Sequence, residues 1–155
     1  MEIRRFVPSD AEAVAELIAV TMRTTNLGDY TAEALEALID HMNAQEMINR
    51  ASWMHFYVVE EAGELIGCGA IGPYWGKEDE SSLFTIFVRP DRQGQGVGRR
   101  IVETLENDEF ALRARRIEIP ASITGTPFYL KMGYTYKDGI TEPDDERLLR
   151  LEKFR

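Results

Sequence analysis

Apolar residues along this chain of 155 residues follow two different spacings, and each spacing predicts a different kind of element. Apolar positions three or four residues apart predict helices over residues 9–22, 31–42 and 97–105. Short alternating or continuous apolar runs, rich in β-branched and aromatic residues, predict strands. The predicted strands span residues 3–7, 53–60, 64–71, 83–88, 117–119, 134–137 and 148–154.

Polar residues mark where the first two helices begin. Ser9, followed three residues later by Glu12, has the form of a capping box. Thr31 can cap the second helix with its hydroxyl. The apolar periodicity of the second helix fades through residues 43–50, so the pattern predicts no further helix there.

The predicted elements follow the order β-α-α-β-β-β-α-β-α-β-β. The last helix in this order is short and begins at Thr126. This order combines hairpins with two crossover connections, which favours an α/β fold with a mixed sheet. The run 83–88 is apolar on both faces, as expected of a central strand. Because no repeat or interdomain linker interrupts the pattern, we expect one domain over residues 1–155.

A glycine-rich turn follows the predicted central strand and carries the strongest chemical signal. Glycines stand at positions 94, 96 and 98, directly before a predicted helix. Such a turn leaves backbone N–H groups bare at the positive end of a helix, where a phosphate can bind. A Walker loop would need Lys and Ser or Thr after Gly98, where Arg99 and Arg100 stand. The glycine spacing also fails the dinucleotide fingerprint.

The distribution of charge restricts the partners. The formal net charge is −9, which argues against nucleic acids and anionic membranes as partners. Between Arg89 and Arg100, however, four arginines accompany a single acid, Asp91. We interpret this segment as a positive patch for a small polyphosphate ligand, with a solvated helix start as the alternative.

The cysteine and histidine content restricts the chemistry further. The single cysteine, Cys68, lies in an apolar run and is expected to be a buried small residue and not a nucleophile. It cannot form an intrachain disulfide, which fits a reducing cytoplasm. The chain shows neither a signal-peptide pattern nor a membrane-spanning apolar run. His41 and His55 lie far from other candidate ligands, so we expect no metal site.

Two motifs resemble those of the GNAT superfamily, the Gcn5-related N-acetyltransferases. The first is Gln93-x-x-Gly96-x-Gly98 after the central strand, which is similar to the family's acetyl-CoA pyrophosphate loop. The second, residues 126–134, is similar to the family's C-terminal Phe-Tyr-x-x-x-Gly-Phe/Tyr segment. Within it, Thr126 and Pro127 predict a capped helix start and Gly133 a helix end. The resemblance implies a mixed, mostly antiparallel sheet of about seven strands flanked by about four helices.

The same resemblance implies roles for individual residues in binding acetyl-CoA as a co-substrate. Tyr129 matches the tyrosine that protonates the leaving thiolate, with a packed aromatic residue as the alternative. Ser122 either bonds the ligand or closes a turn on its own backbone. The backbone from Ile86 to Val88 would pair with the pantetheine arm. The implied ligand-binding residues are Ile86, Phe87, Val88, Gln93, Gly94, Gln95, Gly96, Val97, Gly98, Arg99, Ser122 and Tyr129.

The general base departs from the family pattern. Members that carry a base on the central strand often have Glu or His at the positions of Ser82 or Phe84. The remaining candidates are Glu80, Glu118 or a water chain through Ser82, although each acid is more typical of a solvated surface charge. The base therefore stays unassigned, and binding of the small neutral fraction of amine is an alternative.

The expected activity is direct acetyl transfer from acetyl-CoA to a primary amine of a small molecule or protein. The acceptor should contact the loop of residues 24–30, where Asp29 could receive an ammonium group and Tyr30 could close over it. An Asx turn would explain Asp29 equally well. Tyr74 and Trp75 are further candidates. Alternative functions are a CoA-binding sensor with little turnover or transfer of a longer acyl group, and the last strand could pair across a homodimer.

Overall fold

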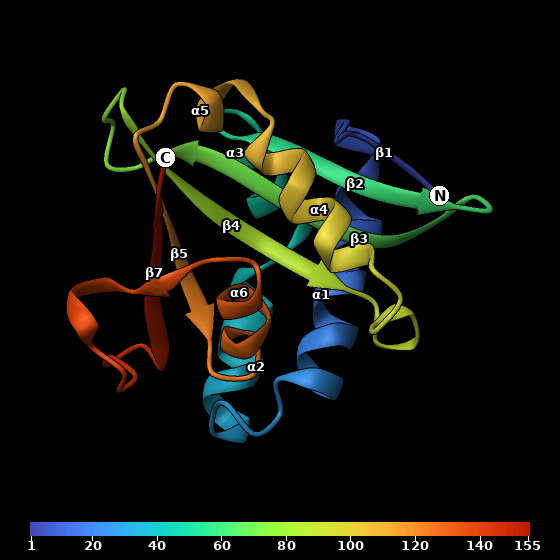
Figure 1. The fold of residues 1–155 in the computed structure, drawn as a ribbon. Helices are drawn as coiled ribbons and strands as arrows, with labels where there is room; N and C mark the ends of the chain where they lie inside the picture. Colours follow the sequence, from blue (N-terminus) through green and yellow to red (C-terminus); the bar gives the residue numbers. More distant parts are fainter.

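A seven-stranded sheet forms the centre of the computed structural model, which describes residues 1–155 (Figure 1). Its strand order is β1-β2-β3-β4-β5-β7-β6, and every neighbouring pair is antiparallel except β4 with β5. The predicted α/β fold with a mixed, mostly antiparallel sheet is therefore confirmed. The strands are β1 (Glu2–Arg5), β2 (His55–Glu61), β3 (Glu64–Pro73), β4 (Glu80–Val88), β5 (Arg116–Ser122), β6 (Thr135–Tyr136) and β7 (Leu148–Phe154).

Helices cover both faces of the sheet, with α4 in front of it and α1 behind it in Figure 1. One apolar cluster joins the sheet to α4 and α6, and a second joins its other face to the first three helices. No helix is both long and apolar enough to span a membrane. The helices are α1 (Ala11–Thr25), α2 (Ala32–His41), α3 (Ala44–Ala51), α4 (Val97–Glu106), α5 (Glu109–Leu112) and α6 (Thr126–Lys131).

Two of these six helices, α3 and α5, were not predicted. Both are short, with eight and four residues, so apolar periodicity gives little sign of them. Each is instead defined by a side-chain cap. The Asn43 Oδ1 atom accepts a hydrogen bond from the Glu46 N–H at 3.0 Å at the start of α3. The Asp108 Oδ1 atom accepts one from the Phe110 N–H at 2.8 Å at the start of α5.

The caps of the first two helices differ in outcome. The capping box predicted at Ser9 does not form, because Pro8–Asp10 is a 3₁₀ turn and α1 begins after it. The Asp10 carboxylate instead pairs with Arg4 at 2.8 Å. The cap predicted at Thr31 is confirmed, since its hydroxyl accepts the backbone N–H three residues later at 3.1 Å.

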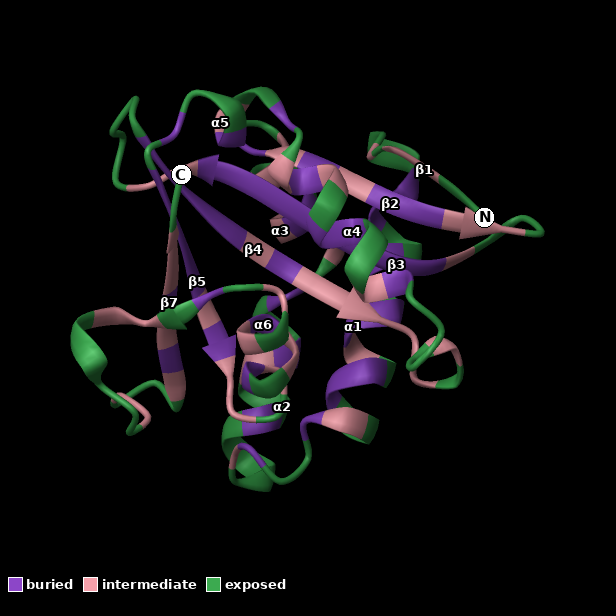
Figure 2. Ribbon diagram, viewed as in Figure 1, coloured by how far each residue is buried: buried purple, intermediate pink, exposed green.

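Strands β4 and β5 pair only at their beginnings and then separate. The pairing starts at Glu80 with Arg116 and ends at Ser82 with Glu118, after which β4 stays with β3 and β5 stays with β7. Figure 2 shows β4 changing from buried to half-buried toward its end, although it lies in the middle of the sheet. We call the space between β4 after Ser82 and β5 after Glu118 the slot. The charged residue Glu80 hid the first part of β4 from the sequence analysis.

A β-bulge lies in β4 beside the slot. Thr85 and Ile86 together face Gly69 of β3, so β4 has one extra residue. Thr85 has a φ of +57°, which is unfavourable for a β-branched residue. Two contacts hold it: the Cys68 thiol donates to the Thr85 carbonyl at 3.2 Å, and Arg50 Nη1 donates to the Thr85 hydroxyl at 2.7 Å.

Candidate active site

The glycine loop, residues 93–99, presents free backbone donors to open space. Gly94 and Gly96 have φ values of +75° and +85°, and a Cβ atom on either would meet nothing within 4 Å. None of the backbone N–H groups from Gly94 to Arg99 donates a hydrogen bond within the protein. They stand at the N-terminus of α4, where the helix dipole favours negative charge. The loop therefore forms a concave anion-binding site made of main-chain amides.

Gly98 has a different role from the other two glycines. A Cβ atom there would lie 3.2 Å from the Phe128 Cζ atom, so glycine at this position lets α4 pack closely against α6. This corrects the interpretation that all three glycines make room for the anion. The contact also brings the two sequence motifs together, since Tyr129 follows Phe128 on α6.

The side chains of the two glutamines in the loop form hydrogen bonds within the protein. The Gln93 side chain donates to the Val88 carbonyl and to the Thr25 hydroxyl, each at 3.0 Å. It thereby fixes the loop to the end of β4 and to α1. The Gln95 side chain donates to the Asp91 carbonyl at 3.3 Å. Their side chains thus position the loop, while the N–H groups from Gly94 to Arg99 remain free.

The end of β4 directs backbone groups into the slot. The Arg89 N–H donates to the Ile66 carbonyl of β3 at 2.8 Å. Because N–H groups of successive strand residues point to opposite sides, the N–H group of Val88 points toward the side that β5 has left. An extended ligand in the slot could therefore pair with this edge of β4.

Two of the four arginines in the predicted positive patch form ion pairs within the protein. Arg89 pairs with Asp91 at 2.6 Å, and Arg92 pairs with Glu61. These ion pairs reduce the local positive potential that the sequence indicated. Of the four arginines in this patch, Arg99 and Arg100 have no acidic partner.

Tyr129 is 9% exposed, and its hydroxyl makes no hydrogen bond within the protein. Every fully buried side-chain nitrogen or oxygen has a partner, so this hydroxyl must reach open space. A Tyr129 that served only as a packed aromatic residue would be expected to bond its buried hydroxyl to a backbone carbonyl, and no such bond is present. Burial raises the pKa of Tyr129 above its usual value, so the phenol stays protonated and acts as a hydrogen-bond donor.

Ser122 closes the turn between β5 and α6. Its hydroxyl accepts a hydrogen bond from the Gly125 N–H at 3.0 Å. The Thr126 hydroxyl donates to the Ser122 carbonyl at 2.8 Å and does not cap α6, whose N-cap residue is Gly125. The predicted hydroxyl cap at Thr126 is therefore wrong, and the bonds of Ser122 match the turn alternative.

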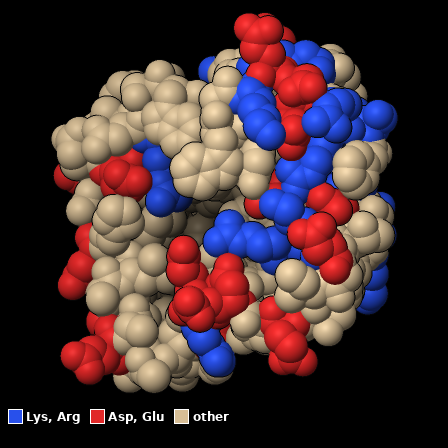
Figure 3. Space-filling view, turned by 90° about the vertical axis from the view of Figure 1, so that its left-hand side faces the viewer, with Lys and Arg blue, Asp and Glu red and all other residues tan.

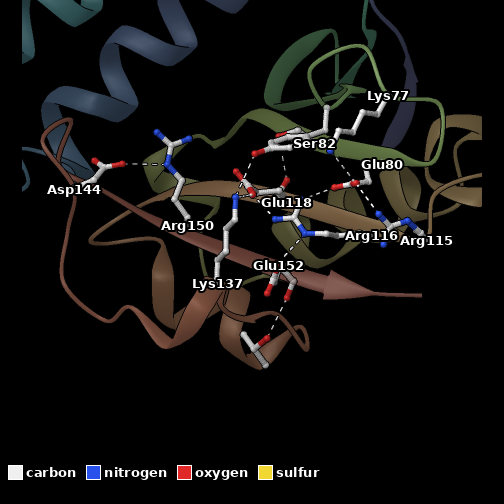
Figure 4. A network of polar contacts seen from close by, with 12 residues as sticks. Lys77, Glu80, Ser82, Arg115, Arg116, Glu118, Lys137, Asp144, Arg150 and Glu152 are labelled. Atoms are coloured by element: carbon white, nitrogen blue, oxygen red, sulfur yellow. Dashed lines mark hydrogen bonds and ion pairs between the residues drawn. The ribbon is translucent and has the colours of Figure 1, made fainter.

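A cluster of charged side chains lies where β4 and β5 pair (Figure 4). At its centre the Arg116 side chain, 7% exposed, contacts three carboxylates. Arg116 lies 2.9 Å from Glu80 and 2.7 Å from Glu152, and it also pairs with Glu118. We call the whole set the charged cluster. Its members are Lys77, Glu80, Arg115, Arg116, Glu118, Lys137 and Glu152.

The two acids considered as bases are not solvated surface charges, which corrects the sequence analysis. Glu80 and Glu118 are 4% and 3% exposed. Burial pushes the pKa of Glu80 upward, but hydrogen bonds from Arg116 and Lys77 outweigh it and hold the pKa below its usual value. Glu118 pairs with Arg116 and, at 3.0 Å, with Lys137.

Ser82 stands where the slot begins, but its hydroxyl is also engaged. It donates to the Glu118 carbonyl at 3.1 Å, across the last paired position of β4 and β5. The three groups considered for proton removal thus lie close together, and each is held by a contact within the protein. The sequence had shown that these residues are present, but not that they bind each other.

Asp29 connects the loop after α1 to the segment after β5. Its carboxylate accepts hydrogen bonds from the Thr124 hydroxyl at 2.7 Å and from the Asn26 side chain at 2.8 Å. These contacts leave Asp29 almost fully buried and occupied by the protein. Tyr30, next to it, lines a cavity of about 360 Å³ together with Arg147 and neighbouring residues of the loop and α2.

Figure 3 shows a hollow on the side of the molecule where the loop after β6 lies, with uncharged residues above it and acids below it. Tyr74, before β4, meets the start of the loop after β6, because its hydroxyl lies 3.3 Å from Lys137 Nζ. Trp75 beside it is largely exposed. Figure 4 shows Lys137 and Arg150 pointing toward the same face of the sheet as Glu118 and Ser82.

Comparison with known proteins places this arrangement among acetyltransferases. Residues 52–136, more than half of the chain, match the family model described as an acetyltransferase (GNAT) domain. A curated amino-acid acetyltransferase of Ralstonia nicotianae is 32% identical over 95 residues, or 61% of this chain. The chain spans only 21% of the length of that relative.

Solved structures with the same fold cover almost the whole chain. A PaiA N-acetyltransferase from Thermoplasma acidophilum, solved with coenzyme A, has a TM-score of 0.85 and 19% identity, over 99% of this chain and 98% of its own. A GCN5-related N-acetyltransferase from Rhodopseudomonas palustris has a TM-score of 0.80 and 22% identity, over 99% and 95%. The fold is thus shared well beyond the range of clear sequence similarity.

Proposed function

The chain belongs to the GNAT acetyltransferase family, and we propose that it transfers the acetyl group of acetyl-CoA to a primary amine of a small molecule or protein. One observation carries the proposal: the free amides of the glycine loop and the unpartnered Tyr129 hydroxyl lie on two helices that touch at Gly98 and Phe128. This contact supports the proposal that a phosphate site and a proton donor serve the same bound thioester.

The donor would bind mainly through the backbone. The N–H groups from Gly94 to Arg99 would hold its diphosphate, and Arg99 and Arg100 add positive charge nearby. The edge of β4 up to Val88 would pair with the extended arm, as a strand pairs with a peptide. The residues present fit this ligand, since the space beside Gly94 and Gly96 is open.

Direct transfer needs no enzyme-bound acyl group. The amine nitrogen bonds to the acetyl carbon while the carbon–sulfur bond breaks, and the sulfur leaves as a thiolate. The nitrogen releases a proton to water, and the thiolate receives one from the Tyr129 hydroxyl, which regains it from solvent. Cys68 plays no part, because burial raises its pKa to about 12 and its thiol bonds Thr85.

Proton removal from the amine is the step for which the chain lacks the base expected from the family pattern. Since Glu80 and Glu118 are held in ion pairs, we propose that the enzyme binds the neutral fraction of the amine. The value of kcat/KM should then rise about tenfold per pH unit up to the pKa of the amine, near ~10 for an alkyl amine. A carboxylate base would instead give a plateau at neutral pH.

The test is release of free thiol from acetyl-CoA in the presence of an amine panel. The name of the curated relative makes free amino acids the first acceptors to try. Transfer that falls in Tyr129→Phe supports the proposal. Tight binding of acetyl-CoA without transfer to any amine would overturn it in favour of a CoA sensor. Faster transfer from succinyl-CoA than from acetyl-CoA would point to a longer acyl group.

A further inference from the structure

Arg50 is a partly buried cation beside the open part of β4. It extends from α3, and its Nη1 atom donates to the Thr85 hydroxyl at 2.7 Å. Thr85 lies in β4 beyond Ser82, where pairing with β5 has ended. The guanidinium group therefore lies next to the slot, on the side of the sheet that carries α1 and α3. This is the face opposite to the one covered by α4 and α6.

The Arg50 guanidinium has hydrogen-bonding capacity to spare. Its Nε atom donates to Glu46 at 2.8 Å, and Glu46 is its only acidic partner. The Nη2 atom donates to nothing in the protein, although the side chain is only 19% exposed. A guanidinium carries five N–H donors in a planar fork that matches a carboxylate. Free donors on a partly buried arginine are therefore suited to a bound carboxylate.

If Arg50 only supported the bulge, its bond to Thr85 would be explained, but its unused N–H donors would not. Thr85 has strained backbone geometry, and the Arg50 contact helps to hold it. A lysine or glutamine could make that single contact. The arginine fork goes beyond it, because its Nη2 atom stays without an acceptor beside the part of β4 that β5 has left.

We infer that the acceptor carries a carboxylate close to its primary amine, as an α-amino acid does, and that Arg50 binds this carboxylate. The inference rests on the proposed function, because it names the acceptor class of the same site. Bound in this way, the carboxylate brings the neighbouring amine to the free edge of β4. Arg50 is thus a specificity-determining residue and takes no part in proton transfer.

The experiment compares three versions of each acceptor: the amino acid, its carboxamide and the amine that lacks the carboxyl carbon. We expect wild-type kcat/KM for the best amino acid to exceed that for its carboxamide by about 10- to 100-fold. In Arg50→Gln this ratio should fall to about one, mainly through KM, while Arg50→Lys should keep an intermediate ratio.

Two matched variants separate recognition from folding. Arg23→Gln removes an exposed arginine that pairs with Glu36 on the same helical layer, and the ratio should stay at the wild-type value. Thr85→Val removes the hydroxyl but keeps the shape, and it should lower transfer to all three acceptors equally. If Arg50→Gln does not fold, the ratio of kcat/KM for the amino acid to that for its carboxamide is measured in Arg50→Lys alone. A ratio below the wild-type value supports the inference, and an unchanged ratio overturns it.

The outcomes are distinct. Transfer to amines and carboxamides as efficient as transfer to amino acids would overturn the inference and leave the proposed function standing. A ratio that survives in Arg50→Gln would also overturn it, because another residue would then bind the carboxylate. Absence of transfer to every acceptor would overturn the proposed function itself.

Discussion

Free main-chain amides follow the end of β4 at one end of the slot, whereas charged side chains surround its other end. The glycine loop offers N–H groups that no side-chain change removes, provided that Gly94 and Gly96 keep their left-handed φ angles. The charged cluster depends on one arginine, Arg116, that is shared by three carboxylates. The first kind of site tolerates sequence change at most positions, and the second is sensitive to the loss of a single group.

The charged cluster also sets where the slot begins. Arg116 on β5 pairs with Glu80 on β4 and with Glu152 on β7, so it joins three neighbouring strands. The pairing of β4 with β5 ends two residues later, at Ser82. We therefore expect changes in the charged cluster to affect stability first, and changes at Gly94 and Gly96 to affect binding most.

The largest effect is expected from Arg116→Met. This change leaves the buried carboxylates of Glu80 and Glu118 without their shared cation. Removal of one partner from a buried ion pair costs about 3–5 kcal/mol, so the free energy of unfolding should fall by that amount. Chemical denaturation would measure it. Arg23→Met is the control, since its pair with Glu36 is exposed on both sides and should contribute far less.

Tyr129→Phe should come next and should affect catalysis rather than stability. The hydroxyl makes no bond within the protein, so its loss leaves no buried group unpaired. Loss of a donor to the leaving thiolate should lower kcat by about 10²- to 10³-fold, with little change in the KM for acetyl-CoA. An unchanged kcat would remove Tyr129 from the mechanism.

Gly96→Val tests the backbone end of the slot. A β-branched residue is strained at a φ of +85°, and its side chain would fill the space in front of the free amides. The Kd for acetyl-CoA should rise by about 10- to 100-fold, measured by calorimetry. Gly139→Val is the matched control, because Gly139 has a φ of +70° and open space but lies in the turn that follows β6.

The smallest effect should be on stability at acid pH. A hydrogen bond from Arg4 lowers the pKa of Asp10, and the bonds from Arg116 and Lys77 outweigh burial to lower that of Glu80. Carboxyl groups with lowered pKa stabilise the fold above their unfolded values of 3.8 and 4.5, and this is lost as the pH falls through the folded values.

The free energy of unfolding should therefore stay level from pH 8 to about 5 and fall by about 1 kcal/mol or more below pH 4. Denaturation in urea at several pH values would measure this fall, and Glu80→Gln should make it less steep. A protein whose stability rose on acidification would contradict the sign of these pKa shifts.

Sequence analysis found the backbone end of the slot because all of its parts are local. A strand, a proline, three glycines and a helix start follow one another between residues 83 and 105, and each acts through short-range geometry. The seven strands and the helices α1, α2, α4 and α6 were found for the same reason. The role of Gly98 was missed, because its neighbour Phe128 is distant in sequence.

The charged end of the slot could not be predicted, because its contacts join distant residues. Glu80 and Arg116 are adjacent only through the pairing of β4 with β5, and Asp29 meets Thr124 only across the folded chain. A charged residue next to an apolar run is usually exposed, so Glu80 and Glu118 were taken for surface charges. The one available sign was the position of Glu118 inside a predicted strand, with Glu80 three residues before another.

The most direct test of the account is an amide NMR titration of ¹⁵N-labelled protein with coenzyme A. The account predicts that the largest shifts of the N–H signals fall on residues 94–99, with further shifts along β4 to Val88. Coenzyme A that binds while the signals of residues 94–99 stay unchanged would contradict it, as would the absence of any binding.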